Sequence, residues 1–213
     1  DYQVWVFSDH GQESTRPFPA DNPGGIEQVL RTCLDASWKR DPAWRARSQH
    51  RATGAWLSRG RISARRHARA RTADQLTGEE QKTFSVAAMG PVGHVYFAEP
   101  KTAEQRLALA RRLISESHVP GVLLHLDHGE VLWLHARGET PRAQMGALLP
   151  HPPAIAAEIV KDLETFCANP DTGDLILLGW TPWDRPWSFA EERGGHGGFG
   201  PEETQGFALL PAL

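Results

Sequence analysis

Two kinds of hydrophobic pattern alternate along the chain. Short, continuous apolar runs predict strands, and stretches in which apolar residues recur every three or four positions predict helices. The strands are expected at residues 3–7, 84–88, 94–98, 122–126, 130–135, 174–178 and 206–210. The helices are expected at residues 21–35, 102–115 and 153–168. The runs at 3–7, 174–178 and 206–210 are expected to be buried, because an uninterrupted apolar strand suits a sheet that is covered on both faces.

The alternation of strands and helices predicts an α/β fold with a mainly parallel sheet. One part of the chain differs from this scheme, because the runs at 122–126 and 130–135 are separated by Asp127, His128 and Gly129 alone. Asp and Gly favour tight turns, so this pair predicts a small antiparallel subregion. His125 and His135, which flank the turn, are expected at the surface or at a sheet edge.

Charge divides the chain into three segments. Residues 39–71 hold eleven Lys and Arg against the single acid Asp41, although the whole chain has a net charge of −3. We therefore expect a core segment at 1–38, a basic insertion or linker at 39–75 and the remaining α/β segment at 76–213. The insertion can be a solvated surface, a site for an anionic membrane surface or nucleic acid, or a positive rim that attracts anionic substrates. Its two aromatic residues, Trp44 and Trp56, give little support to nucleic-acid stacking.

The remaining composition excludes some classes and leaves the location open. No apolar stretch approaches the ~18 residues of a membrane-spanning helix. Cys33 and Cys167 are too few for a disulfide scaffold, and both are expected as buried thiols in helices. The sequence starts at Asp1 rather than Met and enters a strand at once, so we expect a piece of a longer chain in preference to a processed product.

Two polar motifs are candidates for chemistry. The first is residues 8–12, SDHGQ, which follow a predicted strand and in which Asp9 and His10 can both reach one divalent cation. Oxygen and imidazole ligands suit Zn²⁺, Mn²⁺ or iron. The second is residues 194–200, GGHGGFG, where five glycines surround His196. Taken singly, the first motif is more often a polar turn, and the second is more often a flexible loop with an incidental histidine.

Residues near the second motif admit structural and functional interpretations. Glu202 and Glu203 follow the loop and can begin a helix or support His196 from behind, as groups around metal ligands do. Three tryptophans precede the glycine-rich loop and form either a packed loop or the wall of a substrate pocket: Trp180, Trp183 and Trp187.

Together, the two motifs resemble the C-terminal half of the alkaline phosphatase superfamily, in particular its type I phosphodiesterase/nucleotide pyrophosphatase branch. The resemblance covers the strand QVWVF leading into SDHGQ, and GGHGGFGPEET leading into the strand GFALLP. It implies part of an alkaline-phosphatase-like sandwich. It also implies that Asp9 and His10 bind one of two metal ions, with zinc as the expected metal and manganese or iron as alternatives, and that His196 binds the other.

The family's other ligands and its Ser or Thr nucleophile lie earlier in the chain, and none has a counterpart in this sequence. The resemblance thus implies the C-terminal portion of a metal-dependent phosphoester hydrolase, inactive alone, whose partners are an anionic phosphoester and the remaining half of the parent chain. In such enzymes two cations neutralise the phosphoester and assist in-line displacement. The alternative is a non-catalytic domain of the same fold that binds anionic partners through residues 39–71.

Overall fold

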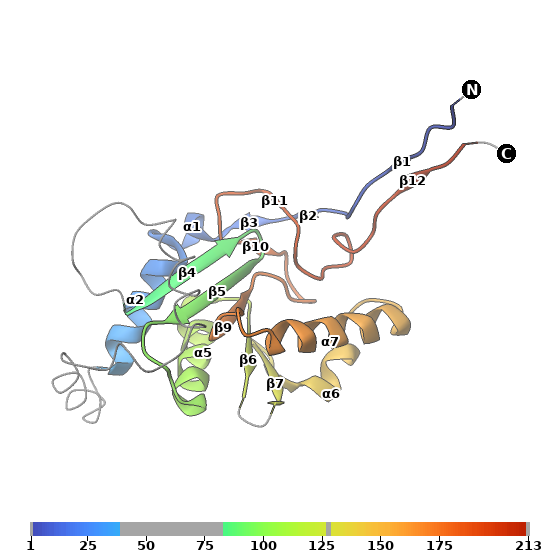
Figure 1. Ribbon diagram of the computed structural model, residues 1–213. Helices are drawn as coiled ribbons and strands as arrows, with labels where there is room; N and C mark the ends of the chain where they lie inside the picture. The colour runs from blue at the N-terminus through green and yellow to red at the C-terminus, as the bar shows by residue number, and fades with distance from the viewer. Residues whose placement is uncertain (1, 39–82, 127–128, 212–213) are drawn as a thin grey trace, which may run out of the picture.

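The computed structural model describes residues 2–38, 83–126 and 129–211 (Figure 1). The predicted basic insertion and the residues Asp127 and His128 of the predicted turn lie outside the described residues. The three described parts share one hydrophobic core, because Phe18 and Leu30 of residues 2–38 pack in the same cluster as Val95 of residues 83–126 and Leu177 of residues 129–211.

A six-stranded sheet forms the centre of the fold. Its order is β4-β5-β9-β6-β7-β8, and every neighbouring pair is antiparallel. The strands are β4 (Phe84–Met89), β5 (Val92–Phe97), β6 (Gly121–His125), β7 (Val131–His135), β8 (Gly138–Pro141) and β9 (Leu175–Leu178). The protein is therefore mixed α/β, as expected.

The prediction of a mainly parallel sheet is wrong. An apolar run records burial on both faces of a strand, but the direction of a strand depends on its connections. β4 and β5 are joined by a tight turn in which Gly90 has a φ of 56°, and β7 and β8 are likewise joined directly. Such short connections can link only antiparallel neighbours. The antiparallel pair predicted near residues 122–135 is confirmed, and this pairing extends across the whole sheet.

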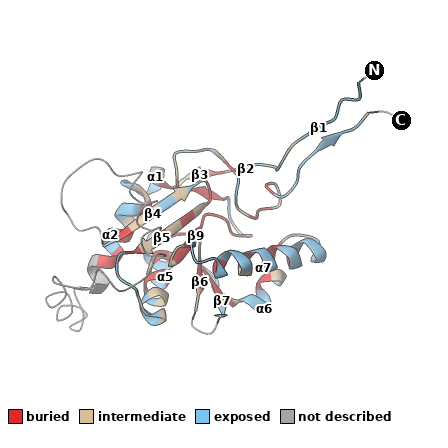
Figure 2. Cartoon of the chain, in the orientation of Figure 1, coloured by how far each residue is buried: buried red, intermediate tan, exposed pale blue. Residues whose placement is uncertain are grey.

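Helices cover both faces of the sheet. Leu175 and Leu177 of β9 point into a cluster with Leu30 of α2 (Gly25–Trp38) and Leu113 of α5 (Ala103–Ser117). The alternate residues of β9 face the cluster beneath α7 (Pro153–Ala168). The short helix α6 (Arg142–Met145) and the 3-10 helix η3 (Gly146–Leu148) extend this second layer. Burial on both sides explains why the central strands are continuously apolar (Figure 2).

The predicted helices are confirmed, with small shifts in their ends. α5 begins after Thr102, whose side chain accepts the Gln105 N–H while the Gln105 side chain accepts the Thr102 N–H, which is a capping box. α7 has the predicted bounds. The predicted helix at 21–35 starts later, because the chain first forms the short helix α1 (Phe18–Asp21) and then turns through Gly24 at a φ of 85°. Cys33 and Cys167 are buried, as expected.

The first and last predicted strands do not lie in the core. β1 (Val6–Phe7) pairs antiparallel with β12 (Ala208–Leu209), and the two project from the body toward both termini (Figure 1). Val6 is 46 % exposed and Phe7 is 70 % exposed. The prediction that these apolar runs are buried is wrong, because the described residues place neither a helix nor a further strand against them.

Two small sheets join the N-terminal segment to the C-terminal loops. β2 (Glu13–Ser14) pairs antiparallel with β11 (Gly194–Gly195), and β3 (Arg16–Pro17) pairs parallel with β10 (Trp187–Ser188). Among the described helices, none has both the length and the apolar character needed to cross a membrane.

Candidate functional site

The pairing of β2 with β11 brings the two candidate motifs together. Gly195 lies opposite Glu13, and the Thr15 N–H donates to the Arg193 carbonyl at 2.9 Å. The chain thereby places the residues just before β2 beside the residues just after β11. His10 and His196, which are far apart in the sequence, belong to these two neighbouring segments.

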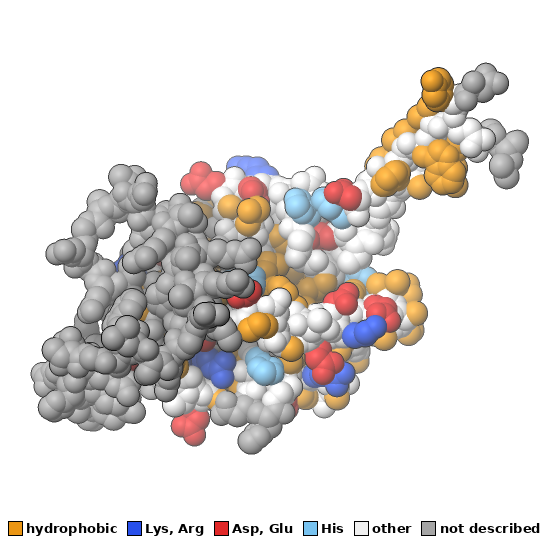
Figure 3. Space-filling model, in the orientation of Figure 1, with side chains coloured by type: hydrophobic (Ala, Val, Ile, Leu, Met, Phe, Trp, Pro, Cys, Tyr) orange, Lys and Arg blue, Asp and Glu red, His pale blue; other side chains and the backbone are white. Residues whose placement is uncertain are grey.

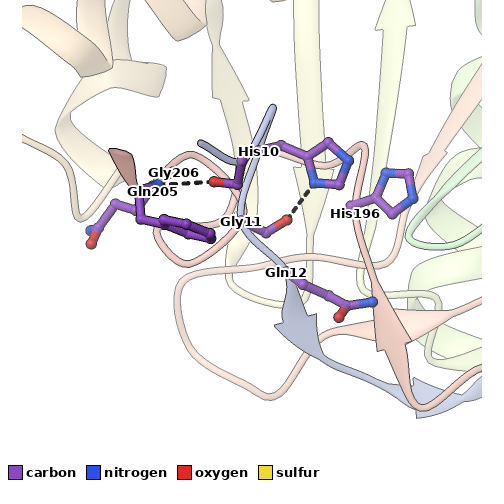
Figure 4. Close-up of a pocket in the computed structure, with 8 residues that line it drawn as sticks. His10, Gly11, Gln12, His196, Gln205 and Gly206 are labelled. Atoms are coloured by element: carbon purple, nitrogen blue, oxygen red, sulfur yellow. Dashed lines mark hydrogen bonds between the residues drawn. The ribbon is translucent and has the colours of Figure 1, made fainter. Parts of the chain in front are cut away.

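The imidazole rings of His10 and His196 are stacked. Their centroids are 4.2 Å apart and their planes differ by 20° (Figure 4). The resemblance assigned these two histidines to one site, and the structure brings them together. Asp9 is adjacent, with its Oδ1 3.6 Å from His10 Nε2, although its side chain is 86 % exposed.

A hydrogen bond of the His10 ring determines which of its two nitrogens carries the proton. Nδ1 lies 2.6 Å from the Gly11 carbonyl oxygen. A carbonyl oxygen only accepts, so Nδ1 carries the proton of this bond and Nε2 of the neutral ring holds the lone pair. An imidazole whose second nitrogen donates to a backbone carbonyl is the usual arrangement of a histidine that binds a metal ion.

The two histidines border an open pocket of about 670 Å³. Its lining combines residues before β2 with residues before β12: Ser8, His10, Gly11, Gln12, His196, Gln205, Gly206 and Phe207. The Ser8 hydroxyl accepts the Phe207 N–H at 2.9 Å, which closes the wall where the pocket meets β1 and β12. The pocket therefore lies at the base of the projecting strands.

Gly11 permits the close contact between the two walls of this pocket. A Cβ atom at this position would lie 1.8 Å from the Glu202 carbonyl oxygen and 2.4 Å from that of Gln205. The Gly11 N–H donates to the Glu203 carbonyl at 2.9 Å. A residue without a side chain is therefore needed here for the approach of another backbone segment.

A buried carboxylate supports the glycine-rich loop. Glu203 is 4 % exposed, and its Oε2 accepts the Gly198 N–H at 2.6 Å, two residues after His196. Its Oε1 is buried and has no hydrogen-bond partner among the described residues. Burial raises the pKa of Glu203 to about 7, although the Gly198 N–H opposes this, and the nearby Glu13 carboxylate adds to the rise. A role of Glu203 behind the His196 loop was one of the predicted interpretations.

Glu13 is a site residue that sequence reasoning missed. It is 7 % exposed, its Oε1 accepts the Glu202 N–H at 3.2 Å, and burial raises its pKa. Its only sequence signal was its position directly after the SDHGQ motif. A carboxylate on the first strand after a polar loop can point inward, and here it ties that strand to the segment that carries Glu203.

An aromatic cluster anchors the glycine-rich loop to the sheet. Phe199 contacts Trp180 and Trp133, with ring centroids 4.9 Å and 5.7 Å away. Trp133 is fully buried, and Trp180 is 3 % exposed. Trp180 and Trp187 are buried and Trp183 is half-buried, and none of the three lines the pocket of His10 and His196, so the loop that carries them is packed, which was one of the two predicted interpretations.

One predicted histidine environment is wrong. His135 is 6 % exposed rather than at the surface, because its Nε2 lies 2.8 Å from the Thr140 hydroxyl and its Nδ1 accepts the Arg137 N–H at 3.2 Å. Burial lowers its pKa, and the Arg137 charge lowers it further. β8 covers this end of β7, which the sequence did not indicate.

The donor set of the site does not form a complete metal centre. The described residues contain no group of three or more His, Cys, Asp and Glu arranged to hold an ion. The lone pair of an imidazole lies in the ring plane, so the lone pairs of two stacked rings lie in two nearly parallel planes about as far apart as the rings. This geometry suits one donor for each of two neighbouring ions better than two donors for a single ion, and ions in two-metal sites lie about 4 Å apart.

Comparisons with models of protein families, with curated proteins and with solved structures find no match for this chain.

Proposed function

We propose that this chain supplies one part of the two-metal site of a phosphoester hydrolase, of the alkaline-phosphatase-like type that its motifs resemble. The observation that carries the proposal is the stacking of His10 on His196 at 4.2 Å in one open pocket. The two motifs are far apart in the sequence, and the pairing of β2 with β11 places a histidine of each at the same pocket. The antiparallel sheet does not support the proposal, which rests on the two loops.

The residues have separate roles in this proposal. His10 and Asp9 contribute to one ion, and His196 contributes to the other. The ions, zinc by preference and manganese or iron as alternatives, supply charge neutralisation for an anionic phosphoester. The Gly11 carbonyl holds the His10 ring by accepting the Nδ1 proton. Glu203 fixes the backbone of the His196 loop through Gly198. The nucleophile and the remaining ligands come from the other half of the parent protein.

The test measures bound metal and turnover of a p-nitrophenyl phosphodiester by the protein encoded in the complete reading frame. We expect His10→Ala and His196→Ala each to lower both by more than roughly 100-fold, since losing groups that merely orient metal ligands already costs 10–100-fold. His125→Ala is the matched control, because His125 lies on β6 and does not line the pocket. Unchanged metal content and turnover in both site variants would reject the proposal.

The alternative function, binding of anionic partners through residues 39–71, lies outside the described residues. No described residue favours it. Salt-dependent binding of the chain to anionic vesicles, together with a complete protein that neither binds metal nor turns over phosphodiesters, would support it over the hydrolase.

A further inference from the structure

Eight of the eleven large hydrophobic residues that are exposed on the described part of the chain lie on the projecting strands. We call residues 2–7 and 207–210 the arm. Figure 3 shows its hydrophobic side chains gathered away from the body of the molecule. The exposed fractions range from 46 % at Val6 to 98 % at Tyr2. The arm contains no Asp, Glu, Lys or Arg, so no charged side chain offsets the cost of exposing its apolar residues to water.

The area of this surface is that of a protein interface. The large apolar residues of the arm are at least 46 % exposed: Tyr2, Val4, Trp5, Val6, Phe7, Phe207, Leu209 and Leu210. An aromatic side chain can bury about 150–250 Å², so the arm offers on the order of 1,000 Å². A stable protein interface buries about 800 Å² on each partner. The arm alone therefore reaches the size of a specific contact surface.

Apolar residues lie on both faces of the arm. Val6 pairs with Leu209 and Phe7 pairs with Ala208, and side chains alternate between the faces of a strand. Val4, Val6 and Leu209 therefore share one face, and Trp5 and Phe7 share the other. An edge-to-edge pairing of two copies would leave both faces in water, and a face-to-face pairing would cover one face only. A second copy of this chain thus leaves apolar surface exposed.

The arm also has unpaired edges. β1 and β12 form a sheet of two strands, and no other described strand pairs with either of them. A two-stranded ribbon is at best marginally stable alone in water, and its unpaired backbone groups are a template for further strands. Uncharged, unpaired edges and two apolar faces are the properties of strands from the interior of a sheet that has layers on both sides.

We propose that the arm is the docking surface for a polypeptide that presents an unpaired strand edge between two apolar layers. The strands of this polypeptide pair with the edges of the β1–β12 ribbon and extend it into a larger sheet. Ser8 and Phe207, at the base of the arm, line the pocket of His10 and His196. A polypeptide docked on the arm therefore reaches this pocket. The identification of this polypeptide with the half that carries the nucleophile rests on the proposed function.

The test compares backbone amide hydrogen exchange in this chain alone and in the protein encoded by the complete reading frame. In the chain alone, we expect the arm amides to exchange at nearly the rate of an unfolded peptide, while those of β6 and β9 are protected. In the complete protein, we expect the arm amides to slow by roughly 100-fold or more, because exchange then requires opening of a packed sheet. Equal rates in both proteins would overturn the proposal.

Two variants separate docking from general effects of charge. Phe7→Lys introduces a charge on the arm, and Met89→Lys introduces the same charge at the 75 % exposed end of β4. In the complete protein, we expect Phe7→Lys to abolish the slowing of the arm amides and Met89→Lys to preserve it. In the chain alone, neither variant should alter the circular dichroism spectrum, which shows that Phe7→Lys does not act by unfolding the core.

The other outcomes are also informative. If the chain alone forms a dimer in sedimentation, with arm amides protected as concentration rises, the occupant is a second copy and the proposal is wrong. If the complete protein protects its arm but binds no metal and hydrolyses no phosphodiester, the docking surface stands and the proposed function fails. If the complete protein binds metal but its arm amides exchange as fast as in the chain alone, the proposed function stands and the docking surface fails.

Discussion

Two apolar strands of this protein look alike in sequence and have opposite environments. β9 (Leu175–Leu178) is 0–2 % exposed throughout, whereas β1 (Val6–Phe7) is 46–70 % exposed. β9 lies between the layers of α5 and α7, and β1 has no described layer on either face. The difference shows that an apolar run specifies a strand suited to burial on both faces, while the burial itself depends on what the rest of the molecule supplies.

The candidate site lies between these two regions. On one side, Phe199 fixes the glycine-rich loop to the aromatic cluster of the sheet. On the other side, the segment that carries His10 continues directly into the arm. One half of the pocket is therefore anchored to the stable core, and the other half lies next to exposed apolar strands. Substitutions in the core should therefore lower the free energy of unfolding more than substitutions in the arm.

The largest expected effect is that of Trp133→Ala in the core. Trp133 is fully buried and packs against Trp180, Phe199 and His135. Removing a buried aromatic side chain costs about 3–5 kcal/mol. Urea unfolding of the chain at pH 6 measures this loss. Trp133→Phe, which retains an aromatic ring, should lose less, and a loss below about 1 kcal/mol for the alanine variant would mean that the cluster does not hold the sheet.

The sequence predicted the core well because the core follows local rules. The apolar spacing of α7, the capping pair Thr102 and Gln105 of α5, and the turn at Gly90 all determine structure within a few residues. The direction of the strands was predicted incorrectly because burial on both faces does not distinguish parallel from antiparallel neighbours. The exposure of Val6 and Phe7 could not be predicted, because it depends on the absence of a covering layer.

The candidate site was predicted in part. The resemblance joined His10 with His196, which no spacing rule connects, and the structure stacks them. Glu13 was not found, because a single carboxylate in a short strand has no distinguishing pattern. Its burial arises from the pairing of β2 with β11 and from the Glu202 N–H, which are contacts between distant segments.

A smaller effect is expected from Glu203 at the boundary of the two regions. Burial raises its pKa from 4.5 to about 7, so between these pH values the folded protein holds a proton that the unfolded chain releases. The stabilisation is complete below pH 4.5 and is lost as the pH rises through 7, with a total of about 3 kcal/mol. Glu203→Gln should therefore lessen the decrease in unfolding free energy between pH 5 and pH 8.

Urea unfolding at a series of pH values measures this dependence. Glu191→Gln is the matched control, because Glu191 is exposed in the loop that precedes β11. Part of the dependence should remain in the Glu203 variant, since burial also raises the pKa of Glu13. An unchanged slope in Glu203→Gln would show that this carboxyl ionises in the folded protein as readily as in the unfolded chain.

The smallest effect is expected in the arm, and it completes the comparison with the core. Phe7→Ala removes an aromatic side chain, as Trp133→Ala does, but Phe7 is 70 % exposed and gains little from folding of this chain. We expect the unfolding free energy of the chain to change by less than about 0.5 kcal/mol, as for other surface substitutions. In the protein encoded by the complete reading frame, the same substitution should cost about 3–5 kcal/mol if the arm is buried there. Urea unfolding of both proteins measures the two losses of unfolding free energy. Similar losses would mean that Phe7 is as exposed in the complete protein as in the chain alone. The arm would then be an exposed feature of the complete protein as well.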